Sequence, residues 1–544
     1  MTCDRLDTKI NDFIIRRNSN TEKLIVKFKF NQKNLDIIRS IPNRKWVQEK
    51  KHWIIDSVFG QDLVDIIKDN NIIKIRLVDN KWYLIGIISN GILDEIDNAC
   101  SYEHPDSLYM QRHLSYTWDG IVHLFNKKSR SFPVGLIEII KKILGFYKIK
   151  YIIEDYKIKH CLFKIKNCIK LRDYQAQVVK NAIESGRCII PLPVGSGKTL
   201  CAIALACYYN KPTIFLCPTK EILYQTIDSF KRFIIDDIKI GIIGDGYIDA
   251  GHITIATYQS ISSAIKHNKK EIMDYLDSVE VMIADECHHV SSDTFYQIAM
   301  RIPAKIRIGL TATPMRTDNT ELKFIAAIGK CISAPKTTCL IEQGWLVPAD
   351  IKIFKLPRNK TIKFSDTYSE IYDKYILCNE VRNNIIKRIA DIMIEHGRKV
   401  LILVSRIKHG DILKNMIEPS DFIYSASQER KKIYEEMRIG KRKCVIATQI
   451  FDEGVDLLAV DCIIIVGGGK SPIKTIQRIG RGLRCFKDKR NTIIIDFIDN
   501  ARYLYLHSME RIKTYNEVFG NAKIVMNLTN VNIIRKKDIE KSLL

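Results

Sequence analysis

The stretch Pro193-Val194-Gly195-Ser196-Gly197-Lys198-Thr199 decides the fold of this chain. It follows the apolar run Cys188–Ile190 and precedes a helical pattern over 200–209, which is the order strand, glycine-rich turn, helix. Backbone N–H groups in such a turn, with the positive end of the following helix, hold the phosphates of a nucleotide. A strict phosphate loop has glycine where this chain has Leu192, so a plain glycine turn is the alternative.

The residues of this stretch have separate tasks if it binds phosphate. Lys198 reaches the terminal phosphates, and Thr199 places its hydroxyl on Mg²⁺. The residues expected to bind the nucleotide are Pro193, Gly195, Ser196, Gly197, Lys198 and Thr199.

A pair of carboxylates follows a later apolar strand. Val281–Ala284 runs directly into Asp285 and Glu286. An acid at the end of a buried strand beside a phosphate loop is placed to hold Mg²⁺, and the next acid is placed to polarise the attacking water. The alternative is a solvated acidic turn. The position after a buried strand and downstream of Lys198 favours the catalytic interpretation.

Four further blocks accompany these two, in the order of a known motif set. They are Leu171–Gln175, Leu310–Pro314, Ala447–Asp456 and Gln477–Arg484. All six together resemble the motifs of superfamily 2 helicases, over about residues 168–520. Agreement of six blocks rather than one makes the resemblance specific.

The resemblance implies a role for each matching residue. Gln175 would read the adenine of ATP, with Arg172 or Tyr174 beside the base. Asp285 would hold Mg²⁺, and Glu286 would activate water. The remaining roles fall to residues that face the γ-phosphate (Gln477, Arg481, Arg484), contact the nucleotide (Gly454, Asp456), or couple ATP to nucleic acid and link the lobes (His288, Thr311, Thr313).

The arginines of the last block have a physical task. Phosphoryl transfer spreads charge over the equatorial oxygens, and an arginine supplied across a cleft stabilises that charge. The alternative is a surface basic helix that touches only a phosphate backbone. We favour Arg481 and Arg484 as catalytic fingers.

Alternation of strands and helices from residue 166 onward predicts parallel sheets covered on both faces. The resemblance implies two RecA-like lobes, 166–335 and 336–524, followed by a charged tail, 525–544, whose end we expect to fray. Strands are expected at 189–191, 213–217, 253–257, 281–284 and 307–311 in the first lobe, and at 400–404, 422–424, 444–447, 462–466 and 492–496 in the second.

Several polar residues just past the strand ends are candidates for nucleic-acid contact. Thr219 and Thr257 match positions that grip a strand backbone in the family, and helix capping by the hydroxyl is an equal alternative at each. Arg406 and Thr448 resemble the corresponding contacts of the second lobe.

The first 165 residues lack catalytic motifs, and we divide them into two small α+β modules, 1–79 and 80–165. A hairpin with Trp46 and Trp53 beside Arg44 and Lys45 suits nucleic-acid contact by charge and stacking. The alternative makes the tryptophans core residues, and we expect one of them to be buried. This module resembles the HARP domain, and residues 112–136, with Trp118, resemble the N-terminal domain of UvsW-type phage recombination helicases.

Composition narrows the class of protein. The 544 residues carry a formal charge of +24, which attracts a polyanion. Fifteen cysteines without any C-x-x-C spacing indicate small buried hydrophobes in a reducing compartment, not a zinc site or a disulfide framework. Without a signal peptide or a membrane-length apolar run, we expect an intracellular, cytoplasmic protein with no membrane partner, and a viral or phage origin is compatible.

The sequence as a whole predicts an α/β protein with two RecA-like parallel-sheet lobes behind two small α+β modules. Its predicted activity is an ATP- and Mg²⁺-dependent superfamily 2 helicase on forked, branched or single-stranded DNA, in recombination or repair. The alternatives are a duplex translocase or remodeller without strand separation, a restriction-type motor subunit, and an RNA helicase.

Overall fold

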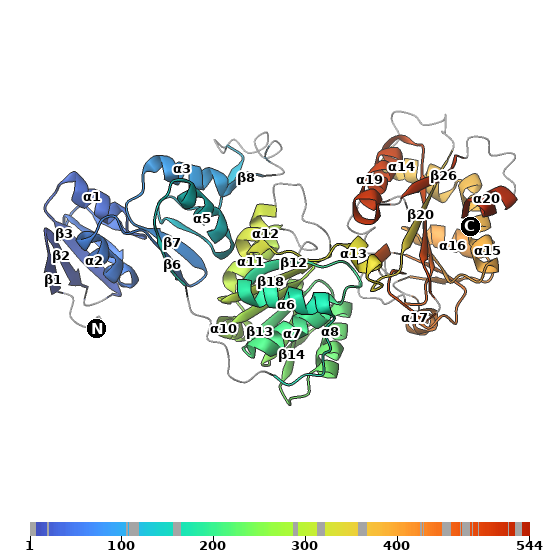
Figure 1. The fold of residues 1–544 in the computed structure, drawn as a ribbon, viewed down its shortest axis with the longest axis horizontal. Helices are drawn as coiled ribbons and strands as arrows, with labels where there is room; N and C mark the ends of the chain where they lie inside the picture. Colours follow the sequence, from blue (N-terminus) through green and yellow to red (C-terminus); the bar gives the residue numbers. More distant parts are fainter. Residues whose placement is uncertain are drawn as a thin grey trace. The chain divides into compact units, whose positions relative to one another are not determined.

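A computed structural model describes the chain at residues 7–18, 21–104, 107, 119–155, 165–286, 292–312, 321–356, 367–424, 427, 429–448, 458–467, 469, 479–480, 482–487, 489–520, 522–527 and 536–543. These residues form two compact units (Figure 1). Residues 1–190 and 202–333 belong to the first unit, and residues 191–201 and 334–544 belong to the second.

The first unit begins with an antiparallel sheet of five strands in the order β1-β2-β3-β5-β4. Its elements are β1 (Asp7–Ile10), β2 (Phe13–Arg17), β3 (Lys23–Phe28), α1 (Gln32–Arg39), β4 (Lys45–Val47), β5 (His52–Asp56) and α2 (Gly60–Lys68). Alternation along β2 buries Phe13 and Ile15 against both helices, as the period of two in a strand requires. The expected tryptophan hairpin is present as β4 and β5.

A second small sheet follows, in the order β10-β7-β6-β11. Its elements are β6 (Lys74–Val78), β7 (Lys81–Ile85), α3 (Asn90–Ala99), β10 (Ser131–Pro133), α5 (Ile137–Phe146) and β11 (Ile152–Glu154). Strands β6 and β7 pair as a hairpin across the boundary expected at residue 79. The change from the first sheet to the second therefore lies between α2 and β6.

This second module packs closely on the larger sheet of the same unit. The Asn80 side-chain amide donates to the carbonyls of Met300 and Ile302, at 3.0 and 2.9 Å. A Cβ on Gly135 would lie 1.7 Å from the Ile325 carbonyl oxygen in α12 (Glu321–Ala327), so only glycine fits there. The module is therefore fixed to the lobe that follows it.

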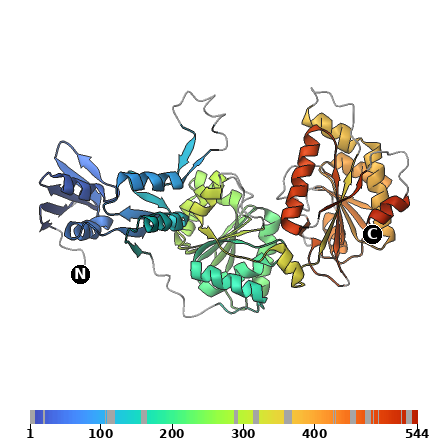
Figure 2. The same cartoon turned by 45° about the horizontal axis from the view of Figure 1, so that its top comes forward.

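The larger sheet has the order β15-β14-β16-β13-β17-β18-β12-β19. Its strands are β12 (Arg187–Pro191), β13 (Thr213–Cys217), β14 (Ile240–Gly244), β15 (Tyr247–Asp249), β16 (Ile253–Thr257), β17 (Val281–Asp285), β18 (Ile306–Thr311) and β19 (Lys330–Cys331). All five expected strands are present within a residue or two. Strands β14, β16, β13, β17 and β18 run parallel, with helices on both faces (Figures 1 and 2).

The second unit holds a parallel sheet of seven strands in the order β22-β23-β21-β24-β25-β20-β26. Five were expected: β21 (Val400–Leu403), β22 (Asp421–Ile423), β23 (Cys444–Ala447), β24 (Cys462–Ile465) and β25 (Thr492–Ile498). The two others are β20 (Ala349–Lys355) and β26 (Lys523–Asn527). In Figure 2 helices flank this sheet on both sides.

The expected fraying of the chain end was wrong. Residues Lys536–Leu543 form α20, and Ile539 and Leu543 are buried in the core of the second unit. These two side chains are four residues apart, so they share one face of the helix and pack together. The segment is a folded part of the lobe.

Cysteines 188, 217 and 462 are buried, as expected, and burial raises the pKa of the Cys188 thiol to about 12. The part of the chain that the structure describes contains no cluster of potential metal ligands. Among the same residues, no helix is both long and apolar enough to cross a membrane.

Candidate nucleotide and nucleic-acid site

The glycine-rich stretch has the backbone of a tight turn between β12 and α7 (Lys198–Tyr209). Gly195 and Gly197 both have a φ of +83°, a conformation that residues with a Cβ rarely adopt. The Ser196 hydroxyl is buried and donates to the Pro193 carbonyl at 2.6 Å. Leu192, where the strict pattern has glycine, is a fully buried core residue. The departure from the pattern therefore fills the core and leaves the turn intact.

Lys198 and Thr199 open helix α7, so both lie at the positive end of its dipole. Residues 191–201 belong to the second unit, and Gly195 lies near two of its other residues. A Cβ there would lie 3.1 Å from Leu346 Cδ2 and 3.3 Å from Arg484 Cγ. Arg484 is half-buried, and this partial burial lowers the pKa of its guanidinium. The structure thus brings the loop and one predicted finger together.

Asp285 ends the fully buried strand β17, two strands from β12 in the sheet. Its backbone carbonyl accepts a hydrogen bond from the Tyr258 hydroxyl at 2.9 Å. Glu286 follows with a φ of +46°, an unusual conformation for a residue with a side chain. Such strain is common at functional sites, where surrounding structure holds it in place.

Two hydrogen bonds hold Glu286, one through its backbone and one through its side chain. The Glu286 N–H donates to the Leu310 carbonyl at 2.9 Å, and its carboxylate accepts from the Ala312 N–H at 3.4 Å. Ala312 directly follows Thr311, a predicted coupling residue that is buried at the end of β18. The structure therefore joins the acid pair to the segment predicted to link the lobes. His288 and Thr313 lie outside the described residues.

The predicted adenine contacts lie at the start of α6 (Asp173–Ser185). The Gln175 side-chain oxygen accepts from the Arg172 N–H at 2.9 Å and closes a capping box. Gln175 is almost fully buried, which holds its amide in one orientation. Adenine recognition by Gln175 stays a prediction.

Thr219 and Thr257 both cap helices. Thr219 accepts from the Ile222 N–H at the start of α8 (Lys220–Phe233), and Thr257 accepts from the Ser260 N–H at the start of α9 (Tyr258–Lys266). The capping alternative therefore describes both threonines. A contact with a phosphate backbone stays a prediction at each.

The predicted contacts of the second unit have local partners. Arg406 pairs with Asp373, donates to the Ser369 hydroxyl at 3.0 Å, and stacks over the Tyr372 ring at 4.6 Å. Thr448 is buried just after β23. The remaining predicted residues of this unit, Gly454, Asp456, Gln477 and Arg481, lie outside the described residues.

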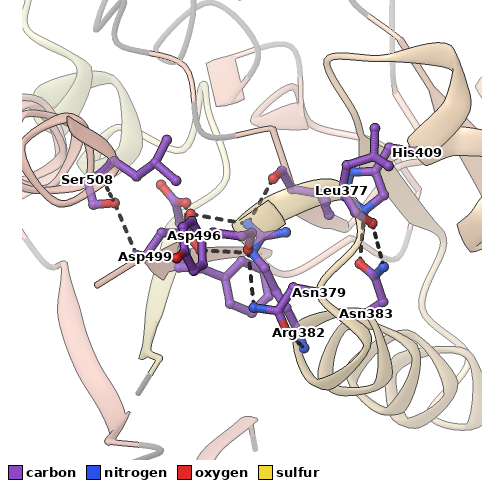
Figure 3. Close-up of polar contacts among 12 residues, drawn as sticks. Leu377, Asn379, Arg382, Asn383, His409, Asp496, Asp499 and Ser508 are labelled. Carbon is purple, nitrogen blue, oxygen red and sulfur yellow. Dashed lines mark hydrogen bonds and ion pairs between the residues drawn. The ribbon is translucent and has the colours of Figure 1, made fainter. Parts of the chain in front are cut away.

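A buried polar network lies around the end of β24, before the arginine block, and sequence reasoning missed it. Arg382 pairs with Asp499 and donates to the Val466 carbonyl at 2.9 Å (Figure 3). Arg511 pairs with Asp496 and donates to the Gly469 carbonyl at 3.1 Å. Burial alone would lower the pKa of Arg511, and Asp496 raises it overall. Two buried cations thus bind the carbonyls of Val466 and Gly469.

The N-terminal hairpin differs from expectation in two respects. Neither of its tryptophans is fully buried: Trp46 is 45% exposed, and Trp53 is partly buried against the core. Arg44 donates to the carbonyls of Ile41 and Lys128, and burial lowers the pKa of its guanidinium. Arg44 therefore ties the two small sheets together, whereas Lys45 is exposed on β4.

Comparison with known proteins identifies two conserved domains in the chain. Residues 168–316 match the family described as type III restriction enzyme, res subunit, and residues 380–486 match the helicase conserved C-terminal domain. The matched ranges contain the glycine-rich stretch and the acid pair in one case and Arg484 in the other.

Several curated proteins are similar over most of the chain. A protein provisionally named helicase 22, from a Sulfolobus islandicus filamentous virus, is 26% identical over 84% of this chain and 87% of its own length. The DNA 3'-5' translocase XPB2 of Sulfurisphaera tokodaii is 26% identical over 64% and 85%. The ATP-dependent DNA helicase uvsW of phage T4 is 22% identical over 80% and 95%. The crystal structure of T4 UvsW aligns with a TM-score of 0.42 and 21% identity, over 84% of this chain and 100% of that one.

Proposed function

Because the chain belongs to the superfamily 2 helicases, whose two conserved domains it carries, we propose that it is an ATP-driven DNA helicase acting on forked or branched DNA. Members of this superfamily are nucleic-acid-dependent ATPases. The single observation that carries the ATP part is the turn of Gly195 and Gly197, both at a φ of +83°, which leads directly into Lys198 at the start of α7.

The motif resemblance gives each of these groups a chemical role. Lys198 and the first N–H groups of α7 would hold the β- and γ-phosphates, and Thr199 with Asp285 would hold Mg²⁺. Glu286, fixed by the Leu310 carbonyl and the Ala312 N–H, would orient the attacking water. Arg484, the described arginine of the last block, would stabilise charge on the transferred phosphoryl group.

The Glu286 contact suggests how hydrolysis reaches the DNA. The Glu286 carboxylate is hydrogen-bonded to the Ala312 N–H and so connects the nucleotide site to the 311–312 segment. Loss of the γ-phosphate would change the partners of the Glu286 carboxylate. The hydrogen bond to Ala312 would then form or break, and the 311–312 segment would be held or released with it. The lobes would then change their affinity for a strand in turn and step along it, and the names of the relatives support a 3'-5' direction.

Forked or branched DNA is proposed as the substrate because the chain carries two small modules ahead of its motor. The second module is fixed to the first lobe through Asn80 and Gly135, so a junction that it binds would move with that lobe. Similarity to the phage T4 protein named ATP-dependent DNA helicase uvsW supports the choice of DNA over RNA. Translocation on duplex DNA without strand separation is the second candidate, supported by similarity to a named DNA translocase.

Strand displacement tests the proposal. The wild-type chain should release the labelled strand of a forked duplex in the presence of ATP and Mg²⁺, and Lys198→Ala should lose this activity with its ATP turnover. DNA binding without nucleotide should survive in the variant, because Lys198 would contact phosphate of ATP and not of DNA. Turnover equal to wild type in Lys198→Ala would refute the phosphate-loop assignment. Turnover on DNA without any strand release would favour the translocase.

A further inference from the structure

A pocket of about 390 Å³ opens on the first N-terminal sheet, and none of its lining residues belongs to a motif of the motor. Four of the nine residues that line it are aromatic: Phe28, Phe30, Trp46 and Trp53. Its volume lies in the range of about 300–1,000 Å³ that small-ligand pockets occupy. The pocket is therefore large enough for a flat ring.

Strand register explains why aromatic rings gather here. Val26 of β3 lies opposite Trp53 of β5, and Trp53 lies opposite Trp46 of β4, so the three side chains form one row on one face. Helix α1 covers the Val26 end of the row, where Val26 is fully buried. Trp46 sits at the other end, on the edge strand, and is 45% exposed. The aromatic row thus continues beyond the helix that covers its start.

The rings at the open end do not cover one another. Trp46 and Trp53 have centroids 5.3 Å apart and planes tilted by 52°, so neither shields the other as a parallel stack would. Phe30, just after β3, is 77% exposed. Exposed apolar rings at the mouth of a pocket indicate a ligand that brings an apolar face of its own.

The charges around the pocket indicate which charge the ligand carries beside its apolar face. Lys27, Arg39 and Lys51 belong to the lining, and none of the nine lining residues is acidic. The positive field extends to Arg44, whose pKa is lowered by burial and further by the charge of Arg39. A ligand with a flat ring and an adjacent negative charge would contact both the aromatic and the basic residues of this lining.

We propose that the pocket binds one unpaired base of single-stranded DNA, with the base against Trp46 and Phe30 and the adjacent phosphates against Arg39, Lys27 and Lys51. The inference rests on the proposed function, which supplies single strands at a fork. A duplex hides its base faces, so only an unpaired base can enter. None of the nine lining residues is Asn, Gln, Ser or Thr, so the pocket accepts bases without reading their edges.

Equilibrium binding without nucleotide tests the pocket on the full chain. The probes are a labelled twelve-nucleotide dT strand, an abasic strand of the same length, and a blunt duplex. Trp46→Ala should weaken dT binding by about ten-fold or more, the usual effect of losing one base stack, and should leave abasic and duplex binding unchanged. Arg39→Ala should weaken both single strands and reduce the salt slope by about 0.7.

Phe30→Ala provides a second variant that cannot disturb the core, because Phe30 is 77% exposed, and Phe146→Ala removes an equally exposed ring elsewhere in the unit. Phe30→Ala should weaken dT binding and Phe146→Ala should not. The proposal is overturned if both Trp46→Ala and Phe30→Ala bind dT like the wild type, or if they lose dT, abasic and duplex binding equally. This binding test contains no ATP, so it is independent of the proposed motor activity. Binding as predicted, together with no DNA-stimulated ATP turnover in a separate assay, would refute the proposed motor function and still support the pocket.

Discussion

The buried pair of Arg382 and Asp499 allows stability and activity to be separated by mutation. Both side chains are nearly inaccessible to water, and the Arg382 Nε donates to Asp499 Oδ1 at 2.8 Å. Arg382→Met would leave the Asp499 carboxylate buried without its counter-charge. Breaking such a pair costs about 3–5 kcal/mol, which is a large part of the stability of an ordinary domain.

A second change should restore most of that loss. In Arg382→Met with Asp499→Leu, neither member of this pair leaves an unpaired charge behind, and apolar replacements of buried pairs are often neutral or stabilising by about 1–4 kcal/mol. The double variant should nevertheless stay less active than wild type. Its Val466 carbonyl has lost the Arg382 donor at 2.9 Å, and Val466 precedes the loop that leads to the arginine block.

Hydrogen exchange is the assay, because it reports the free energy of opening for one lobe in a protein of several. In Arg382→Met, the amides of β24 and β25 should exchange faster, by an amount that corresponds to a free energy of opening lower by about 3–5 kcal/mol. In the double variant their exchange rates should return toward the wild-type values. DNA-stimulated ATPase should fall in both. A loss below about 1 kcal/mol in the single variant, or a double variant as unstable as the single, would refute the account of a desolvated charge.

Three further predictions concern other parts of the chain. Glu286→Gln should bind ATP but hydrolyse it at least about a hundred-fold more slowly, and a normal steady-state rate would remove Glu286 from its role. Gly135→Ala should destabilise the contact with α12 by about 1–3 kcal/mol, seen as faster hydrogen exchange there, because its Cβ would meet the Ile325 carbonyl. Gly145→Ala, whose Cβ would meet nothing within 4 Å, is the matched control and should not destabilise. Burial and the charge of Arg382 lower the pKa of His409 to about 3, so below about pH 6.5 the unfolded chain binds a proton that the folded chain does not. This group should lower the free energy of unfolding of the second unit by up to about 1.4 kcal/mol for each pH unit as the pH falls. The urea midpoint of His409→Gln should therefore depend less on pH between 7 and 5 than that of the wild type.

Fully buried strands were the most predictable elements, because an apolar run flanked by turns has few other interpretations. The strands at 213–217, 253–257 and 444–447 have their expected bounds. Strand β20 was missed because Asp350 and Lys352 interrupt its pattern, although Lys352 is buried and donates to the Ser542 carbonyl. Helix α20 was missed because its sequence is mostly polar and charged, and among its described residues Ile539 and Leu543 are the ones that enter the core cluster.

The position of the nucleotide site could be predicted, but its local geometry could not. The spacing of glycines before Lys198 indicates a turn that binds phosphate, whereas the positive φ of Glu286 depends on contacts with Leu310 and Ala312, distant in sequence. Charge alone was a poor guide to nucleic-acid contacts. Arg44 is tied to two carbonyls, whereas the exposed cations Lys27, Arg39 and Lys51 line the aromatic pocket.

The most direct test of the central claim is the ATPase rate of the wild-type chain against a panel of nucleic acids at one salt concentration. The panel comprises no nucleic acid, single-stranded DNA, blunt duplex, a fork, a four-way junction and RNA, with Lys198→Ala as the inactive control. The account predicts low turnover alone and the strongest stimulation by forks or junctions. Equal stimulation by blunt duplex, or stimulation by RNA alone, would contradict it.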